Sequence, residues 1–500
     1  MQEMLLSRLV QPLSSKKLTG SADVEISSVV YDSRRVGAGA LFACIRGAKF
    51  DGHDFIAEAL RSGASALLVE RPERVPADAR APFVTVPDTR AALPILANQF
   101  FDYPSRRLRL IGVTGTNGKT TTTYLIESML RSAGRATGVI GTLGAQIHGQ
   151  EVETERTTPE SVDLQELLAR MVSEGVEVAA MEVSSHALAM RRTMGCEFDI
   201  GVFTNLTQDH LDFHRSLEDY LDAKLTFFRE YAKASSKQFT AIVNVDDPNG
   251  ERVARATCGT VLTYGIHRPA DVRAARIHAA AGGIEFHVAC TVGEFDVKMR
   301  LGGSFNVYNS LAAVGVGIAL GLGVREIRTG LEAVPAVAGR FEAVDCAQDF
   351  SVIVDYAHTP DGLENVLHSA RELAKARLIV VFGCGGDRDR AKRPIMGRIA
   401  ADLADVCIVT SDNPRSESPD AIIGDIVAGI DGGRKTAVEV VPDRRDAIKQ
   451  ALDIASAGDL VVIAGKGHET YQIFKDQVVH FDDREVVREL LSGAQAHKGR

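Results

Sequence analysis

The stretch VTGTNGKTTT (113–122) continues an apolar run, LRLIGV (108–113), and leads into a segment with helical periodicity. A strand, a glycine-rich turn and a helix start in this order direct backbone N–H groups and the positive end of a helix at an anion. Lys119 would reach the terminal phosphates of a nucleotide, and the hydroxyl group of Thr120 or Thr121 would join a magnesium shell. The stretch predicts a phosphate site, but it does not identify what accepts the phosphate.

The glycine pattern departs from the general phosphate-loop template. Val113 stands where GxxxxGK[ST] has its first glycine, and Gly112 and Gly115 flank that position. The alternative is a strand-to-helix turn that binds nothing. A second cluster, FGCGGDRD (382–389), has Arg388 where a GxGxxG fingerprint needs its last glycine. A plain tight turn is the simpler interpretation there, and a dehydrogenase is not favoured.

The composition is that of a soluble globular protein with more than one domain. The 500 residues suggest about three units, and the hydrophobic and charged fractions of 45% and 25% are ordinary. A net charge of −9 argues against a nucleic-acid-binding body. The longest apolar run, LAAVGVGIALGLGV (311–324), is shorter than the roughly 18 residues that indicate a membrane span. It predicts a buried helix of small residues.

The N-terminal stretch and the cysteines favour a cytoplasmic location. The apolar N-terminal stretch is short and is interrupted by Arg8, unlike a signal peptide. Seven cysteines are scattered without a CxxC pair, which indicates reduced thiols and neither a disulfide framework nor a zinc site. Cys384 and Cys407 lie in apolar, strand-like contexts, so we expect them to pack in a core.

Alternating strand and helix patterns predict an α/β fold with three domains. A small N-terminal α/β domain occupies 1–104, a central P-loop-type ATPase domain with a mostly parallel sheet occupies 105–335, and a Rossmann-like α/β domain occupies 336–500. In open sheets of this kind ligands bind at the carboxyl ends of the strands. The candidate ligand-binding motifs of this chain all fall at such ends.

Three segments that follow expected strands or lie near them offer candidate metal ligands. They are MEVSSHA with Glu182, NLTQDHLDFH with His210 and DYLDAKLTFF with Lys224. Magnesium on a triphosphate prefers oxygen ligands, so Glu182 suits it and one imidazole is tolerable. Taken singly, each has a simpler explanation: a solvated or capping glutamate, a core histidine and an exposed helical cation.

Eleven motifs, read together, are similar to those of the ATP-dependent Mur ligases. In order along the chain they are GTNGKTT, TTPE, MEVSSHAL, FTNLTQDHLDFH, YLDAKLTFF, FNVYNSLAA, GRFE, DYAHTPD, GCGGDRDRAKRP, SDNPR and AGKGHE. The N-terminal segments VYDSR and GAKFDGHDF resemble the family member that adds the third amino acid. The resemblance extends from about residue 114 to 469, with the N-terminal segments in addition.

The resemblance implies that the phosphate goes to a carboxylate. The enzyme would add meso-diaminopimelate to the D-glutamate side chain of UDP-N-acetylmuramoyl-L-alanyl-D-glutamate through an acyl phosphate, in peptidoglycan precursor synthesis. ATP and Mg²⁺ would be required, the two substrates would be its only partners, and the chain would act as a monomer. Cationic groups and metal would stabilise the developing oxyanion. No residue is identified as the base that takes the proton from the amine.

The resemblance also assigns residues to each ligand. The positions that match ATP contacts are Gly115, Thr116, Asn117, Gly118, Lys119, Thr120, Thr121, Asn306, Asn309, Arg340 and Asp355. The positions that match contacts of the UDP-linked substrate are Ser33, Thr157, Thr158, Ser184 and Arg192. The positions that match diaminopimelate contacts are Arg388, Asp412, Asn413, Pro414, Arg415, Gly465 and Glu469. The catalytic positions are Lys119, Glu182, His210 and Lys224.

The expected metal shell contains Thr120, Glu182, His210 and Lys224, the last as an N6-carboxylysine. In relatives this lysine is carbamylated by carbon dioxide, which turns a cation that would repel magnesium into an oxygen-bearing anion. His358 lies in the AHTPD element without an assigned role. Met190 stands where relatives often have a glutamine, so one substrate hydrogen bond is in question.

The choice of amino acid rests on SDNPR (411–415). Diaminopimelate has a carboxylate at its distal centre, where lysine has only hydrogen, and Arg415 can hold a carboxylate in a bidentate pair. Losing two such bonds, at roughly 1.5–3 kcal/mol each, would disfavour lysine about a hundredfold or more. Asp412 and Glu469 suit an ammonium group. The alternative is an Asx-Pro turn with a solvated arginine.

Other functions remain as alternatives. The nearest has the same chemistry with L-lysine, and a folate- or cyanophycin-type amide ligase is further away because of DNPR and VYDSR. A binding protein that has lost catalysis predicts substitutions among the four catalytic positions, and all four are intact.

Overall fold

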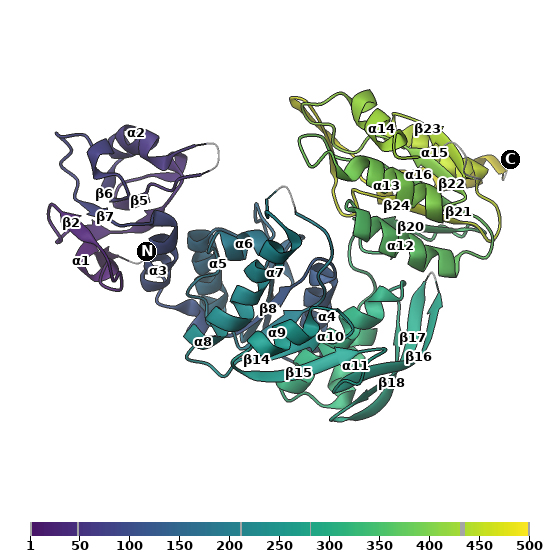
Figure 1. Cartoon of the computed structure of the whole chain (residues 1–500), viewed down its shortest axis with the longest axis horizontal. Helices are drawn as coiled ribbons and strands as arrows, with labels where there is room; N and C mark the ends of the chain where they lie inside the picture. The colour runs from purple at the N-terminus through teal and green to yellow at the C-terminus, as the bar shows by residue number, and fades with distance from the viewer. Residues whose placement is uncertain (1–2, 48–49, 211–212, 281, 431–435, 499–500) are drawn as a thin grey trace.

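The computed structural model describes residues 3–47, 50–210, 213–280, 282–430 and 436–498. Three α/β units follow one another along the chain, with the central unit between the other two (Figure 1). The α/β class is confirmed. Among the described residues no helix is both long and apolar enough to pass through a bilayer. The predicted limits 1–104, 105–335 and 336–500 stay predictions. Helix α3 ends at Phe100 and strand β8 begins at Arg109.

The N-terminal unit has a five-stranded sheet in the order β2-β7-β6-β5-β4. The strands are β2 (Lys17–Thr19), β4 (Ser28–Val30), β5 (Ala40–Ala43), β6 (Ala64–Val69) and β7 (Phe83–Thr85). All neighbouring pairs are parallel except β2 with β7. The other elements are β1 (Met4–Leu5), β3 (Glu25–Ile26), α1 (Leu6–Leu9), α2 (Ile56–Arg61) and α3 (Thr89–Phe100).

The central unit has an eleven-stranded sheet in the order β11-β10-β9-β12-β8-β13-β14-β15-β16-β17-β18. The strands of its parallel part are β8 (Arg109–Thr114), β9 (Thr137–Gly141), β12 (Val178–Glu182), β13 (Ile200–Phe203), β14 (Thr240–Asn244), β15 (Thr260–Gly265) and β16 (Val272–Ala280). Antiparallel strands extend both edges: β10 (Gly144–Ile147), β11 (Gln150–Val152), β17 (Gly283–Cys290) and β18 (Gly293–Met299). The sequence pattern predicted the parallel part but not these edges.

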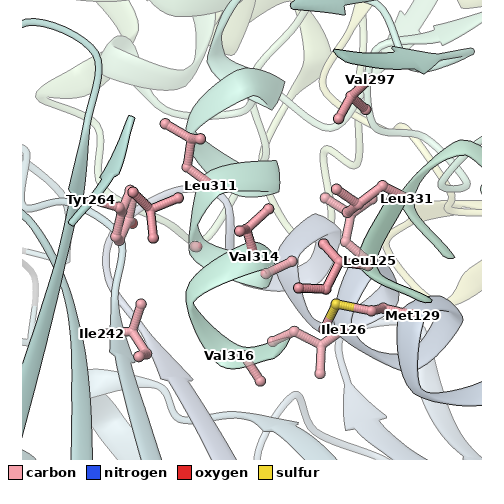
Figure 2. Packing of buried hydrophobic residues seen from close by; sticks show 14 of the residues in the cluster. Leu125, Ile126, Met129, Ile242, Tyr264, Val297, Leu311, Val314, Val316 and Leu331 are labelled. Carbon is pink, nitrogen blue, oxygen red and sulfur yellow. The ribbon is translucent and has the colours of Figure 1, made fainter. Parts of the chain in front are cut away.

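Helices cover both faces of this sheet. They are α4 (Lys119–Ser132), α5 (Ser161–Ser173), α6 (Ser185–Ala189), α7 (Leu217–Thr226), α8 (Ala232–Ala234), α9 (Gly250–Ala256), α10 (Phe305–Ala319) and α11 (Val324–Glu332). Helix α10 contains most of the apolar run 311–324 and is buried, as predicted. Figure 2 shows its side chains between α4 and the strands, with Leu311, Val314 and Val316 among them. Gly317 approaches Met129 of α4 so closely that a β-carbon would lie 2.8 Å from the sulfur atom. The small residues therefore allow close helix packing.

The C-terminal unit has a six-stranded sheet in the order β19-β20-β24-β21-β22-β23. Its strands are β19 (Glu342–Ala343), β20 (Ser351–Asp355), β21 (Leu378–Phe382), β22 (Val406–Val409), β23 (Ala437–Val440) and β24 (Leu460–Ala464), and only β19 is antiparallel. Its helices are α12 (Pro360–Leu373), α13 (Lys392–Leu403), α14 (Pro419–Val427), α15 (Arg444–Ile454) and α16 (Asp483–Lys498), and a hairpin joins β25 (Tyr471–Phe474) to β26 (Gln477–His480). Cys384 and Cys407 are buried in its core, as predicted.

Candidate active site

The phosphate loop joins β8 to α4, as the sequence predicts. Gly115 and Gly118 have φ angles of 153° and 83°, and a β-carbon at either would collide with Thr204 or Asn309. The loop therefore requires glycine at both positions. With Thr120 and Thr121 in the first turn of α4, the loop presents backbone N–H groups at a helix N-terminus, which is the geometry that binds a phosphate.

The Lys119 side chain folds back onto the phosphate loop. Its Nζ donates hydrogen bonds to the carbonyl oxygens of Gly115 (3.0 Å) and Thr116 (2.7 Å). Burial lowers the pKa of Lys119, while the nearby carboxylates of Glu182 and Asp209 act in the opposite direction. A bound phosphate would restore the preference for the charged ammonium, so the lysine fits an anionic ligand.

Glu182, at the end of β12, lies directly against the loop and is 1% exposed. Its Oε1 accepts hydrogen bonds from the Thr120 hydroxyl (2.9 Å) and the Thr142 amide (2.8 Å), and its Oε2 accepts one from the Thr142 hydroxyl (3.1 Å). Arg340 donates to the Thr120 hydroxyl over 3.1 Å. Carboxylate and hydroxyl oxygens beside a phosphate loop are a donor set that suits magnesium.

Lys224 is 1% exposed, so the interpretation as an exposed helical cation is wrong. It lies on α7, and its Nζ donates to the Gly115 carbonyl (2.9 Å) and stands 4.3 Å from the Tyr220 ring centroid. Burial, followed by the charge of Lys119, lowers the pKa of Lys224 well below its ordinary value. The neutral amine is the form that can attack carbon dioxide.

His210 is held near the loop in a left-handed conformation, with φ of 55°. Its ring meets the ring of His186 edge-on, with centroids 4.7 Å apart, and both rings line the cavity between the central and C-terminal units. In the described part of the chain, no three histidine, cysteine or carboxylate side chains form a ready-made metal site. A site with few protein ligands suits magnesium, because this ion keeps several waters and substrate phosphates in its coordination shell.

The other residues matched to ATP contacts include Asn306 and Asn309 on α10 and Asp355 at the end of β20. Asn309 lies beneath Gly118 and donates to the side-chain oxygen of Asn306 over 2.8 Å. Asp355 accepts a hydrogen bond from the Phe341 amide over 2.6 Å. Burial raises the pKa of Asp355 to about 6, although Arg340 opposes the shift. Phe305 at the start of α10 packs against Phe341, with ring centroids 5.5 Å apart, so α10 lies next to the segment that binds Asp355 of β20.

Four of the five positions matched to the UDP-linked substrate come together beside Glu182. Thr157 lies 3.1 Å from the Thr142 hydroxyl. The Thr158 hydroxyl donates to the Glu182 carbonyl (2.8 Å), and Ser184 caps α6. Arg192 binds Glu160 (2.9 Å) and the Thr158 carbonyl (3.2 Å).

Ser33, the fifth position, lies in the N-terminal unit. It begins a short 3-10 turn that ends at Arg35. The side chains of Tyr31, just before this turn, and of Arg35 both bind Asp163 of α5. This contact places the N-terminal unit against the central one. Met190 occupies the position where relatives often have a glutamine, and its sulfur accepts a hydrogen bond from Arg192 (3.3 Å).

A cavity of about 530 Å³ lies between the central and C-terminal units. Six of the seven residues matched to diaminopimelate line it: Arg388, Asp412, Asn413, Arg415, Gly465 and Glu469. The seventh, Pro414, is buried and does not line the cavity. Asp209, His210 and His358 line the same cavity from the side of the phosphate loop and β20.

Arg415, the arginine of SDNPR, contacts the second glycine cluster (382–389). Arg415 donates from Nη1 to the Gly386 carbonyl over 2.7 Å, and a β-carbon at Gly385 would lie 2.9 Å from the same nitrogen. The GCGG turn therefore leaves space for a guanidinium group. Its partial match to the GxGxxG dinucleotide-binding fingerprint does not indicate this role. Arg415 has a φ of 52°, is half-buried and forms an isolated bridge with Phe474, so it is not part of a simple turn with a fully solvated side chain.

Comparisons with known proteins agree with this geometry. The chain matches the Mur ligase family catalytic domain over residues 25–101, the Mur ligase middle domain over 113–317 and the Mur ligase glutamate ligase domain over 339–467. A relative from Syntrophomonas wolfei, named UDP-N-acetylmuramoyl-L-alanyl-D-glutamate–2,6-diaminopimelate ligase, is 48% identical over 98% of this chain and 99% of its own. A relative of the same name from Geobacillus thermodenitrificans is 47% identical over 97% and 99%.

The chain belongs to the Mur ligase family.

Solved structures place this Mur ligase in the same family fold. A structure of a UDP-N-acetylmuramoyl-L-alanyl-D-glutamate–2,6-diaminopimelate ligase superposes with a TM-score of 0.69 at 33% identity, covering 99% of this chain and all of that one. The MurF ligase of Thermotoga maritima, solved in complex with ADP, shares the fold with a TM-score of 0.64 at 21% identity, covering 94% and 98%.

Several residues of this Mur ligase site escaped sequence reasoning. The Asn117 side chain donates to Asp361 of the C-terminal unit. Lys466 is fully buried and binds Glu469 (2.9 Å) and Asn413 (3.3 Å). Asp361 lies in the motif DYAHTPD and Lys466 in the motif AGKGHE. Their positions inside these two motifs are the sequence signal that could have identified them.

His358, left without a role by the sequence, lines the cavity of the ligase. Its Nδ1 lies 2.7 Å from the Tyr356 carbonyl, which can only accept, so the proton of the neutral ring is on Nδ1. Desolvation by the surrounding cavity walls and the cationic Lys392 lower its pKa to about 4, although the side chain is exposed at the cavity surface. The ring is therefore neutral at physiological pH, with an unprotonated Nε2.

Proposed function

We propose that this Mur ligase uses ATP to join meso-diaminopimelate to the D-glutamate side chain of UDP-N-acetylmuramoyl-L-alanyl-D-glutamate. The observation that carries the proposal is the position of Arg415 in a cavity that Asp209 and His210 of the central unit also line. The names of relatives at 47–48% identity support the same substrates. The L-lysine-adding reaction is not favoured, since it leaves the arginine without an anion.

The first step transfers a phosphoryl group. A carboxylate oxygen of D-glutamate attacks the γ-phosphorus of ATP, the bond to ADP breaks, and an acyl phosphate forms. Lys119 and the loop amides hold the phosphates, and Thr120 and Glu182 would hold magnesium. When bound, magnesium would neutralise the phosphate charge and orient the transferred group. Lys119 remains cationic against the phosphates and stabilises the charge that develops on them.

The second step forms the amide. The diaminopimelate amine attacks the acyl carbon, the tetrahedral intermediate collapses, phosphate leaves as the carbon–oxygen bond breaks, and the amine loses a proton. Asp412, Asn413 and Glu469 line the cavity where they would orient ammonium groups, while Arg415 would hold the distal carboxylate. The Asn413 side chain is held in position, because it donates a hydrogen bond to Glu469 over 2.8 Å.

The proposal is tested by phosphate release from ATP with the purified protein and UDP-N-acetylmuramoyl-L-alanyl-D-glutamate, with meso-diaminopimelate or L-lysine as the amine. We expect release with diaminopimelate only. Release with lysine alone would retain the ligase and refute the role of Arg415. No release with either amine would refute the ligase activity.

We further propose that Lys224 carries a carbamate in the active enzyme. Its neutral amine would attack carbon dioxide, forming a nitrogen–carbon bond and releasing one proton, and the new oxygens would face the magnesium shell. Burial at 1% exposure and the depressed pKa support this modification.

Carbon dioxide should therefore control the activity. We expect ligation to fall in carbon-dioxide-depleted buffer and to recover when bicarbonate is added, with Lys224→Ala reduced by about 10²-fold or more because a metal-facing anion is lost. Lys233→Ala, a control in the short helix after α7, should behave like the wild type. Activity in the wild type that is indifferent to bicarbonate, together with full activity of Lys224→Ala, would contradict the carbamate.

A further inference from the structure

Arg444 and Asp483 form an ion pair that is buried completely, with both side chains at 0% exposure. The guanidinium binds both carboxylate oxygens, Nε to Oδ1 and Nη2 to Oδ2, each over 2.8 Å. Each residue is the first of its helix, Arg444 of α15 and Asp483 of α16. Neither lines the cavity, and neither belongs to any of the eleven sequence motifs.

The same guanidinium also binds two backbone carbonyls beneath the cavity. Nη1 donates to the Ser411 carbonyl (3.4 Å) and Nη2 to the Ala464 carbonyl (3.1 Å). Ser411 directly precedes Asp412, and Ala464 directly precedes Gly465. Arg444 therefore contacts two of the three chain segments that present the proposed diaminopimelate contacts, the third being the segment of Arg388, and it does so one residue before each contact begins.

These two segments have no direct backbone ladder between them. They follow β22 and β24, and β21 lies between those strands in the sheet. At the end of β21, Gly383 leaves no space for a side chain, because a β-carbon would lie 3.0 Å from the Asp412 amide. The guanidinium is therefore a link that spans the intervening strand.

The charge of Arg444 also acts on the cavity. Burial lowers the pKa of Arg444, but Asp483, Asp412 and Glu469 raise it, and the net shift is upward. Of these carboxylates, Asp412 and Glu469 line the cavity. These are the carboxylates expected to face the ammonium groups of the amino acid.

We propose that Arg444, held by Asp483, is a positioning residue that sets the spacing of the 412–415 and 465–469 segments for the amino-acid substrate. The inference rests on the proposed function. It predicts that affinity for diaminopimelate depends on α16, a helix that lies outside the cavity. The ATP and UDP-substrate sites lie on other segments and would not depend on this pair.

The test is the double variant Arg444→Met/Asp483→Leu, assayed for the KM of each substrate. Removing both charges avoids an unpaired buried ion, and the carbonyl links are lost. We expect the KM for diaminopimelate to rise by about 10- to 100-fold, since small misplacements of binding groups have effects of this size. The KM values for ATP and the UDP-linked substrate should stay at wild-type levels.

Two further variants separate positioning from folding. Arg444→Lys keeps a cation beside Asp483 but lacks the fork that reaches both carbonyls, and should raise the same KM. It carries the test if the double variant does not fold. Arg377→Met removes an arginine–aspartate pair with Asp459, just before the other end of β24, and should leave all three KM values unchanged.

An unchanged KM for diaminopimelate in folded variants would overturn the inference. An equal rise of all three KM values would also overturn it, because that pattern indicates general loosening. A wild-type enzyme that shows no diaminopimelate-dependent phosphate release would overturn the proposed function itself, and the inference with it.

Discussion

Replacing Lys119 with methionine should lower the ligation rate by about 10²–10³-fold, the usual effect of removing one charged group that stabilises a transition state. Methionine is unbranched and nearly as long as lysine, but it loses the ammonium that would face the phosphates. It also loses the two hydrogen bonds from Nζ to the Gly115 and Thr116 carbonyls. The measurement is phosphate release under saturating substrates, together with nucleotide affinity from competition with a fluorescent analogue.

Lys237→Met is the matched control for this variant. Lys237 is also largely buried, and its Nζ binds the Leu108 carbonyl (2.8 Å) and Asp199 (2.6 Å) at the other end of β8. The control should lose stability without losing activity per folded molecule. If Lys119→Met retained the wild-type rate, the assignment of this loop as the catalytic phosphate site would be wrong.

Replacing Arg415 with methionine should reduce kcat/KM for diaminopimelate by about 100-fold or more, from the loss of two charged hydrogen bonds at roughly 1.5–3 kcal/mol each. Any weak activity with L-lysine should change little, so the preference between the two amines should collapse. Methionine is unbranched like arginine, and it keeps the left-handed backbone at φ 52° without added strain from a branched side chain. Competition between the two amines in one assay measures the preference directly.

Arg445→Met tests whether the effect is specific. Arg445 is an exposed arginine of the same unit, paired with Glu489 at 2.8 Å, and its loss should leave the preference intact. A selective loss of lysine activity in Arg415→Met would show that the arginine binds something other than the distal carboxylate.

Local patterns were sufficient to predict the strand-to-helix phosphate turn, the parallel strands and the buried helix of 311–324. Each depends on residues that are close in sequence, such as the glycines before Lys119. The antiparallel strands β10, β11, β17 and β18 were missed because each follows the preceding strand by a hairpin turn. The sequence pattern on which the prediction rested alternates strands with helices, and no helix separates these strands.

The site was predicted in its parts, but the environment of each part depends on tertiary packing. Lys224 reads as an ordinary helical cation, and only the fold shows that it is buried beside Gly115. Arg415 is recognisable, yet its seat on Gly386 joins segments 29 residues apart. Arg444 and Asp483 lie in stretches without a motif, so no local signal identifies them.

The hydrogen bond from Asn117 to Asp361 ties the phosphate loop to a second unit. Asp361 lies in the first turn of α12, so the loop of the central unit is fastened to the unit that holds the amino acid. The Arg340 contact with Thr120 fastens it again. If the C-terminal unit swings away, these bonds must break and the loop must relax. Coupling of this kind is reciprocal, so a nucleotide that bound more tightly to the loop in this arrangement would also favour the contact between the two units.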